Sequence, residues 1–212
     1  MKKGLFIVLE GLDGSGKGTQ MARLEQWLRE QGRQVLVTAE PTASALGGLI
    51  RDSLAGLTPR SAEELSALFS ADRIAHCANP KTGIKAVLQQ GIDVLCDRYY
   101  YSSFAYQGRL TDRRWVMDMN LSCPEILRPD LCLFLDVPPE VGEERLARGR
   151  VRREIYETLE QQTAVRSAFL EVFDLLRERD RIALIQADRP AEEVSQEMIR
   201  QVSALLQEEI RK

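Results

Sequence analysis

The sequence predicts an α/β fold in which a parallel sheet of about five strands is covered by helices on both faces. Short apolar runs rich in β-forming residues alternate along the chain with longer segments whose apolar residues recur at helical spacing. A strand-helix-strand order of this kind requires right-handed crossovers, and these make neighbouring strands parallel. Ligands of such sheets bind at the carboxyl ends of the strands.

The strands are expected at five apolar runs, and most of these runs lack the polar alternation of a strand with one solvent face. They span Leu5–Glu10, Val35–Thr38, Ile92–Cys96, Leu131–Val137 and Ile182–Gln186. We therefore expect most of the strands to be buried on both faces.

Helices are expected between these runs. The first carries apolar residues at positions 21, 24, 27 and 28, and Gly32 follows as a C-terminal stop. Another begins near Ser61, where Ser61-x-x-Glu64 forms a capping box after Thr58-Pro59. Two later helices are marked by apolar residues at helical spacing, Val165, Phe169, Val172 and Leu176 in one and Val194, Met198, Val202 and Leu205 in the other.

Length and composition are those of an ordinary globular protein. The 212 residues favour one domain, 1–212, and 44% hydrophobic residues supply a large core. The net charge of −3 argues against a general nucleic-acid binder, so any anion site must be local. The four cysteines form no C-x-x-C pair, and no run approaches the roughly 20 apolar residues of a membrane span. We expect a soluble protein of a reducing cytoplasm.

The most specific motif follows the first expected strand. Residues 11–17 read Gly-Leu-Asp-Gly-Ser-Gly-Lys and open the first helix, as a phosphate-binding loop (P-loop) does. Its glycines let backbone N–H groups converge on phosphate oxygens, and Lys17 reaches the terminal phosphates. The alternative is a glycine-rich turn with an incidental lysine. The motif predicts a P-loop NTPase fold in which ATP is bound by Gly11, Leu12, Asp13, Gly14, Ser15, Gly16, Lys17, Gly18 and Thr19.

One position of this motif is unusual. The motif has Ser or Thr after the lysine to coordinate Mg²⁺, whereas here Gly18 follows Lys17 and Thr19 comes one step later. We therefore expect nucleotide oxygens and water to hold the magnesium ion.

A second motif, Asp97-Arg98-Tyr99, directly follows the strand expected over Ile92–Cys96. At the carboxyl end of a strand beside a P-loop, Asp97 can hold Mg²⁺ in its outer shell through water, and Arg98 can pair with a phosphate. A structural ion pair at a strand end is the alternative.

A third feature is an arginine cluster around Gly149. It consists of Arg145, Arg148, Arg150, Arg152 and Arg153. Crowded guanidinium groups repel one another without an anion, which is typical of a mobile lid that orders when ATP arrives. A solvated charged loop is the alternative.

Together these motifs resemble the thymidylate kinase family over nearly the whole chain. The other matching segments are Glu40-Pro41-Thr42, residues 68–73 (Leu-Phe-Ser-Ala-Asp-Arg), residues 102–107 and residues 135–140. The resemblance is to the bacterial and archaeal type that takes its catalytic arginine from the LID, here about residues 143–157. It implies a single nucleoside monophosphate kinase domain with an acceptor-binding region at about 40–77. The reaction would transfer the γ-phosphoryl of ATP to dTMP with Mg²⁺, in a homodimer of the cytoplasm that has neither nucleic-acid nor membrane partners.

The resemblance also implies roles for individual residues. Phe69 would stack on thymine, and Arg73 would bond to its carbonyl edge. Tyr106 would crowd the place of a ribose 2′-hydroxyl, and Asp13 would meet the 3′-hydroxyl. The other implied dTMP-binding residues are Glu40, Pro41, Arg51, Arg98, Ser102, Ser103 and Gln107, and the implied catalytic residues are Lys17, Arg98, Arg148, Arg150 and Arg153. His76, the only histidine, is expected at the surface or at a helix end.

Three alternatives remain beside this interpretation. Lys17-Gly18-Thr19 is closer to adenylate kinases, although Asp13 and Asp97-Arg98-Tyr99 differ from that family. A kinase for another nucleoside monophosphate is the second alternative. A non-catalytic P-loop nucleotide switch is the third, and it lacks the Asn/Thr-Lys-x-Asp segment that reads guanine.

Overall fold

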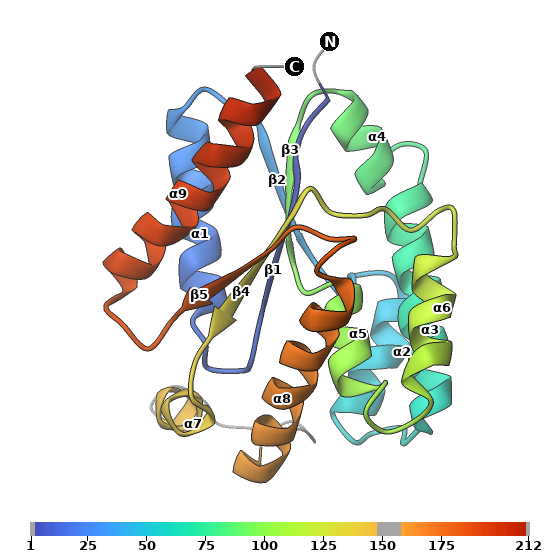
Figure 1. The fold of residues 1–212 in the computed structure, drawn as a ribbon. Helices are drawn as coiled ribbons and strands as arrows, with labels where there is room; N and C mark the ends of the chain where they lie inside the picture. Colours follow the sequence, from blue (N-terminus) through green and yellow to red (C-terminus); the bar gives the residue numbers. More distant parts are fainter. Residues whose placement is uncertain (1–2, 148–157, 211–212) are drawn as a thin grey trace.

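A five-stranded sheet runs through the middle of the molecule with helices on both faces (Figure 1). The computed structural model describes residues 3–147 and 158–210. In chain order the elements are β1 (Phe6–Gly11), α1 (Lys17–Glu30), β2 (Val35–Ala39), α2 (Ala45–Leu54), α3 (Ala62–Ala78), α4 (Ile84–Gln89), β3 (Asp93–Asp97), α5 (Tyr100–Tyr106), α6 (Arg113–Leu121), β4 (Leu131–Asp136), α7 (Pro139–Ala147), α8 (Leu159–Leu176), β5 (Ile182–Gln186) and α9 (Ala191–Ile210). All strand pairs are parallel, so the predicted α/β fold is confirmed.

The strand order β2-β3-β1-β4-β5 places β1 at the centre of the sheet. Leu9 of β1 and Ala39 of β2 both pair with Asp97 of β3, so these three strands end at one edge. The amide of Arg98 donates to the carbonyl of Leu9, and that of Glu40 donates to the carbonyl of Asp97. The P-loop and the segments that begin at Glu40 and Arg98 therefore leave the sheet side by side.

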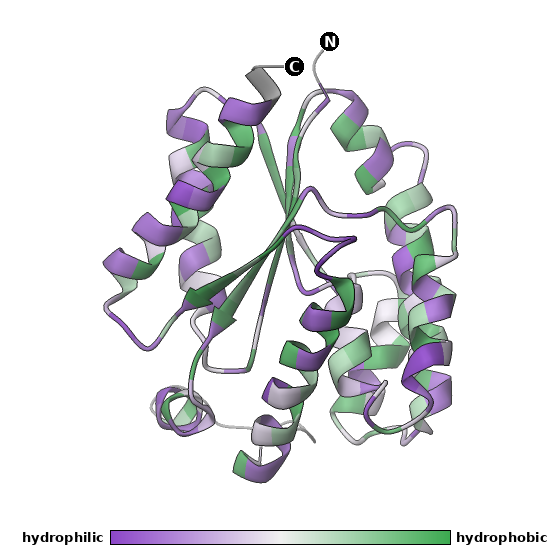
Figure 2. Cartoon of the chain, in the orientation of Figure 1, coloured by the Kyte–Doolittle hydropathy of each residue, from purple (hydrophilic) through white to green (hydrophobic). Residues whose placement is uncertain are grey.

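The core has two layers because successive strand residues point to opposite faces. Phe6 and Val8 of β1 pack toward α5 and α8, whereas Ile7 and Leu9 pack toward α1 and α9. Figure 2 shows the strands as mostly hydrophobic between helices that mix both kinds of residue. Among the described residues, no helix is long and apolar enough to cross a membrane.

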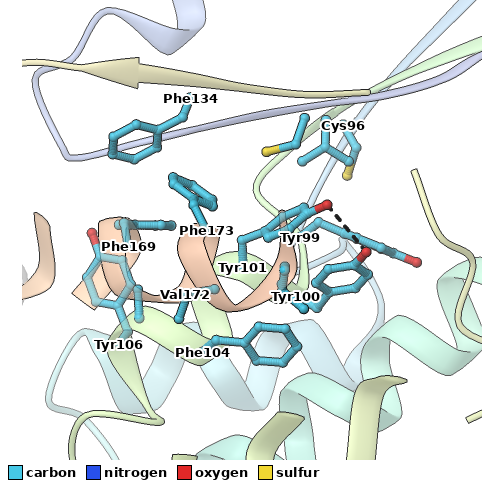
Figure 3. Close-up of a cluster of buried hydrophobic side chains, with 14 of the residues drawn as sticks. Cys96, Tyr99, Tyr100, Tyr101, Phe104, Tyr106, Phe134, Phe169, Val172 and Phe173 are labelled. Atoms are coloured by element: carbon cyan, nitrogen blue, oxygen red, sulfur yellow. Dashed lines mark hydrogen bonds between the residues drawn. The ribbon is translucent and has the colours of Figure 1, made fainter. Parts of the chain in front are cut away.

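A buried aromatic cluster fixes α5 on the sheet (Figure 3). Tyr100 stacks on Phe104, and Tyr101 packs edge-on against Phe173 of α8. The hydroxyl groups of both tyrosines donate to Asp180, at 2.7 and 2.9 Å, so their polar atoms are satisfied in the interior. Because α5 also carries residues 102–106, this cluster determines where those side chains lie.

Burial distinguishes the three central strands from the two edge strands. Burial on both faces holds for β1, β3 and β4, but β2 buries only Val35 and β5 only Ile185. These two are the edge strands, which have a neighbouring strand on one side alone. The capping box at Ser61 is confirmed, with both of its hydrogen bonds formed.

Both ends of the described chain lie at the edge of the sheet opposite to the P-loop (Figure 1). Arg181, which directly precedes β5, forms an ion pair with Glu208 near the end of α9. This arrangement follows because α9 runs back along the sheet from the carboxyl end of β5.

The segment after β2 is held rigidly against α3 and α2. The amide and the hydroxyl of Thr42 donate to Asp72 of α3 at 2.8 and 2.6 Å, and the hydroxyl of Ser44 does so at 2.7 Å. Gly47 of α2 lies so close that a Cβ atom there would be 1.9 Å from the carbonyl oxygen of Thr42.

Gly47→Ala should lower the free energy of unfolding by about 1–3 kcal/mol, because the added methyl group must displace backbone atoms. Gly48→Ala is the matched control, since a Cβ atom there meets nothing within 4 Å. Alanine should stabilise that helical position by about 0.5–1 kcal/mol. Urea unfolding measures both variants, and equal stabilities would contradict the close approach at Gly47.

Candidate active site

A cavity of about 610 Å³ lies at the carboxyl edge of β1, β2 and β3. Most of the residues singled out from the sequence line it, namely Asp13, Gly14, Gly16, Lys17, Gly18, Thr19, Glu40, Pro41, Arg51, Phe69, Arg73, Asp97, Arg98, Ser102, Tyr106 and Gln107. Gly11, Leu12, Ser15 and Ser103 are not part of its lining. Ala39, Leu54 and Tyr99 also line it. Tyr99 belongs to the second motif, but none of the three was assigned to the site, because an apolar wall residue carries the same pattern as a core residue.

The P-loop forms one end of the cavity. Gly14 and Gly16 have φ angles of 80° and 92°, a left-handed conformation that favours glycine. A Cβ atom on Gly14 would also lie 2.2 Å from the carbonyl oxygen of Gly142 in α7. The Lys17 ammonium group donates to the carbonyls of Gly11 and Leu12 at 3.0 and 3.1 Å. Burial, together with repulsion from Arg98, lowers the pKa of Lys17 to about 8.

Arg98 lies between the P-loop and α5 in a left-handed conformation, with φ at 66°. Such strain in a residue other than glycine is found mostly at functional sites. Its guanidinium group donates to Asp13 at 2.6 Å and to the hydroxyl of Ser102 at 3.1 Å. It also lies over the Tyr106 ring, 5.3 Å from the centroid. These neighbours fix the orientation of the positively charged Arg98 side chain toward the cavity.

Asp97 ends β3 beside this arginine. Its Oδ1 atom is buried and has no hydrogen-bond partner among the residues that the structure describes. A buried carboxylate oxygen in this situation is costly unless a ligand or an ordered water completes it.

The opposite wall of the cavity belongs to α3. Phe69 and Arg73, four residues apart, both line the cavity, as their shared helix face predicts. The Arg73 side chain is only 1% exposed and is held by Glu40, Ser103 and Asn120. A planar guanidinium group with this many fixed partners is an oriented hydrogen-bond donor.

Arg51 of α2 lies at a more open part of the wall. Its guanidinium group donates to the carbonyls of Pro41 and Thr42, at 3.2 and 2.6 Å. The segment held by Asp72 therefore also sets the position of this cation.

His76 does not lie at the surface, so that part of the prediction is wrong. It is in the last turn of α3, but its side chain is only 10% exposed. Its Nδ1 atom lies 3.0 Å from Glu40, and its Nε2 atom lies 2.8 Å from the hydroxyl of Thr38. It follows Arg73 by three positions, so both side chains point from α3 toward the end of β2.

Glu10 was missed in the sequence, although an acidic residue inside an apolar strand is a signal of a paired buried charge. Its carboxylate accepts hydrogen bonds from the amides of Tyr99 and Ser102, at 2.8 and 3.1 Å, and from the Ser102 hydroxyl at 2.6 Å. It therefore anchors the start of α5 to β1. Burial raises the pKa of Glu10 to about 7, although Arg98 and these hydrogen bonds oppose the shift.

The arginine cluster is only partly described. Arg148, Arg150, Arg152 and Arg153 lie outside the described residues. Arg145 donates to the carbonyl of Ala187 at 3.0 Å and to that of Gly14 at 3.5 Å, so its cation lies directly beside the P-loop. Arg145 belongs to the arginine cluster, but its position in the sequence does not by itself mark it as a site residue.

The chain is similar to known proteins over nearly its whole length. The family model described as thymidylate kinase matches residues 9–198. A probable thymidylate kinase of Pyrococcus abyssi is 39% identical over 204 residues, which cover 93% of this chain and 95% of that protein. A thymidylate kinase of Leifsonia xyli subsp. xyli is 40% identical over 208 residues, which cover 93% of each chain.

Glu10→Gln should flatten the dependence of stability on pH between about 4.5 and 7. In this window the unfolded chain has released the Glu10 proton while the folded chain retains it, so the free energy of unfolding falls as pH rises. The total loss is on the order of 3 kcal/mol. Glutamine keeps an oxygen for the two amides and an N–H for the serine oxygen.

Urea unfolding at a series of pH values measures this slope. Glu178→Gln, at an exposed position in the turn that follows α8, is the control that should keep the wild-type slope. An unchanged slope in Glu10→Gln would show that Glu10 is ionised throughout the window.

Proposed function

The chain belongs to the thymidylate kinase family and is a kinase that phosphorylates dTMP, and we propose on this premise how its cavity does so. The observation that carries the proposal is that one cavity joins the P-loop to the wall formed by Phe69 and Arg73. A donor phosphate chain at the first end and a nucleobase at the second would bring the two phosphates together beside Arg98.

The transfer of the γ-phosphoryl of ATP asks for alignment and charge neutralisation. The phosphate of dTMP is already a nucleophile, so no strong general base is needed. Lys17 neutralises the terminal phosphates of ATP, and its pKa of about 8 keeps it mostly charged at pH 7. Arg98, oriented by Asp13 and Ser102, holds the acceptor phosphate together with Arg51.

The acceptor nucleoside is read at the α3 wall. Phe69 stacks on the base, while Gln107 lines the same cavity. Arg73 has five N–H groups. Among residues 3–147 and 158–210, Nε donates to Glu40, NH2 donates to Ser103 and lies in the ion pair with Glu40, and NH1 donates one of its two hydrogens to Asn120. Within this described part of the chain, the other hydrogen of NH1 is left over. That remaining N–H is the donor for a carbonyl oxygen of thymine.

The sugar lies between these two ends. Tyr106 lines the cavity and lies under the Arg98 guanidinium group, so its ring can exclude a 2′-hydroxyl. Asp13 lies on the far side of Arg98, within reach of the 3′-hydroxyl. Both assignments rest on the family resemblance and on this placement.

The residues present fit a magnesium ion that is bound mainly by the nucleotide. The buried and unpartnered Oδ1 atom of Asp97 can hold water of the ion's outer shell. Among the described residues, no three metal-ligating side chains come together. The ion would neutralise charge on the ATP phosphates. Gly18 supplies no hydroxyl group, so the protein contributes to the site through Asp97.

The ATP side extends from the P-loop to Arg145, which approaches Gly14. We assign the neutralisation of charge on the transferred phosphoryl to Arg148, Arg150 and Arg153, on resemblance and arginine content alone. The LID would span about 143–157 and the acceptor region about 40–77 of one domain.

A homodimer and a cytoplasmic location complete the proposal. Exposed apolar side chains such as Leu49 of α2 and Trp115 of α6 are available for a subunit interface. All four cysteines are free thiols, as expected in a reducing compartment. Sedimentation equilibrium of the purified protein distinguishes the dimer from a monomer.

A panel of nucleoside monophosphates with Mg²⁺ and ATP tests the assignment of the site. The dTMP reaction should have the highest kcat/KM, and Lys17→Ala should abolish it without changing the circular dichroism spectrum, because Lys17 contributes phosphate neutralisation rather than core packing. Preference for another monophosphate would indicate a different acceptor. Near-normal turnover of Lys17→Ala would refute the P-loop assignment.

Gly18→Thr should lower the Mg²⁺ concentration for half-maximal turnover about 3-fold to 10-fold, because it restores a hydroxyl ligand. The side chain has room, since a Cβ atom on Gly18 meets nothing within 4 Å. Gly18→Val has the same shape without the hydroxyl and should leave the metal requirement unchanged. An equal effect of both substitutions would show that helix stability, not coordination, is responsible.

A further inference from the structure

A chain of half-buried and buried polar groups leads from β2 through α3 to the cavity. It runs from the hydroxyl of Thr38 to His76, then to Glu40 and finally to Arg73. We infer that His76 is a positioning residue that aims Arg73 at the base, so that it sets the preference for a pyrimidine with a carbonyl oxygen at position 4. The inference rests on the proposed assignment of Arg73 to the thymine edge.

The two carboxylate oxygens of Glu40 have separate partners. Oε2 accepts a hydrogen bond from Nε of Arg73 at 2.8 Å and lies 2.7 Å from NH2 of the same ion pair, while Oε1 lies 3.0 Å from Nδ1 of His76. Because a carboxylate only accepts, Nδ1 of His76 carries a proton and donates it to this bond. In the neutral ring, Nε2 then accepts from the hydroxyl of Thr38, 2.8 Å away. Thr38 therefore holds the ring in the orientation that serves Glu40.

Glu40 depends on this second partner. Its side chain is only 2% exposed, so water cannot readily replace a lost donor at Oε1. The terminal torsion of a glutamate is soft, and a carboxylate with one free oxygen can rotate. Rotation would move Oε2 of Glu40, which accepts the hydrogen bond from Nε of Arg73. Ser103 and Asn120 would still hold the other side of the guanidinium group. The free NH1 hydrogen would then point away from its target.

His76 acts through Glu40 because it is not among the residues that line the cavity. An arginine only donates hydrogen bonds, so it favours the position-4 carbonyl of thymine over the position-4 amino group of cytosine. A badly aimed Arg73 should weaken dTMP binding and also reduce discrimination against dCMP. The phosphates lie at the other end of the cavity, beside Lys17 and Arg98, so kcat with dTMP should change little.

Four variants separate the links of the chain. His76→Ala removes both bonds of the ring. His76→Asn places an N–H near the position of Nδ1 and keeps the bond to Glu40. His76→Gln reaches the position of Nε2 and keeps only the contact with Thr38. Thr38→Val removes the far partner of the ring and keeps its volume.

Steady-state kinetics with dTMP and dCMP is the test. His76→Ala should raise KM for dTMP about 10-fold, keep kcat within about 2-fold and reduce the dTMP to dCMP ratio of kcat/KM about 10-fold. His76→Asn should restore KM and the ratio to near the wild-type values, whereas His76→Gln should resemble His76→Ala. Thr38→Val should have a smaller effect of the same kind.

Two results would overturn the inference. One is an unchanged ratio in His76→Ala. The other is a loss of kcat with equal thermal destabilisation in all His76 variants, without rescue by asparagine, which would make His76 a purely structural residue.

Arg73→Lys keeps the positive charge but lacks the planar guanidinium group with its paired N–H donors. This variant distinguishes failure of the His76 inference from failure of the proposed site. If Arg73→Lys keeps the wild-type ratio, Arg73 does not read the base and the site assignment falls with the inference. If Arg73→Lys lowers the dTMP to dCMP ratio of kcat/KM while His76→Ala keeps the wild-type ratio, only the role of His76 is refuted.

Discussion

Strand β1 is hydrogen-bonded on both sides, to β3 and to β4, and the rest of the site depends on this pairing. In the parallel register, Leu9 and Ala39 both pair with Asp97. Three chain segments far apart in the sequence therefore leave the sheet together at the carboxyl ends of their strands. A slip of one residue would move each side chain to the opposite face of the sheet. The two apolar layers of the core resist such a slip, and the position of the P-loop relative to Arg98 is therefore a consequence of packing.

Above this edge the walls of the cavity are held by buried carboxyl groups. Glu10 ties the start of α5 to β1, Asp72 ties the segment after β2 to α3, and Glu40 ties that segment to Arg73. Buried polar contacts of this kind add little net stability, but leaving one partner unpaired is expensive. Each contact thus fixes the mutual placement of two elements that carry ligand-facing side chains. Glu10 and Asp72 do not line the cavity, so its shape depends partly on residues outside its lining.

The sequence predicted the features whose signal is local. The P-loop motif, the capping box at Ser61 and the alternation of strands with helices each lie within a short stretch of chain. The contacts of Glu10 and His76 were not predicted, because their partners come from distant parts of the sequence. Glu10 bonds to Ser102, 92 positions away, and His76 bonds to Glu40, 36 positions away. A pattern within one element shows that a polar residue is unusual, but the contact that explains it exists only after folding.

Both ends of the described chain lie away from the cavity, so labels can be attached there without covering the site. The start of β1 and the end of α9 lie at the amino edge of the sheet, where the ion pair between Arg181 and Glu208 closes the last helix onto β5. A fluorescent reporter or a surface tether attached at either end of the described chain would lie at the opposite ends of the strands from the cavity. Immobilised protein would thus present its open edge to the solution, and nucleotides could enter and leave without passing the attachment point.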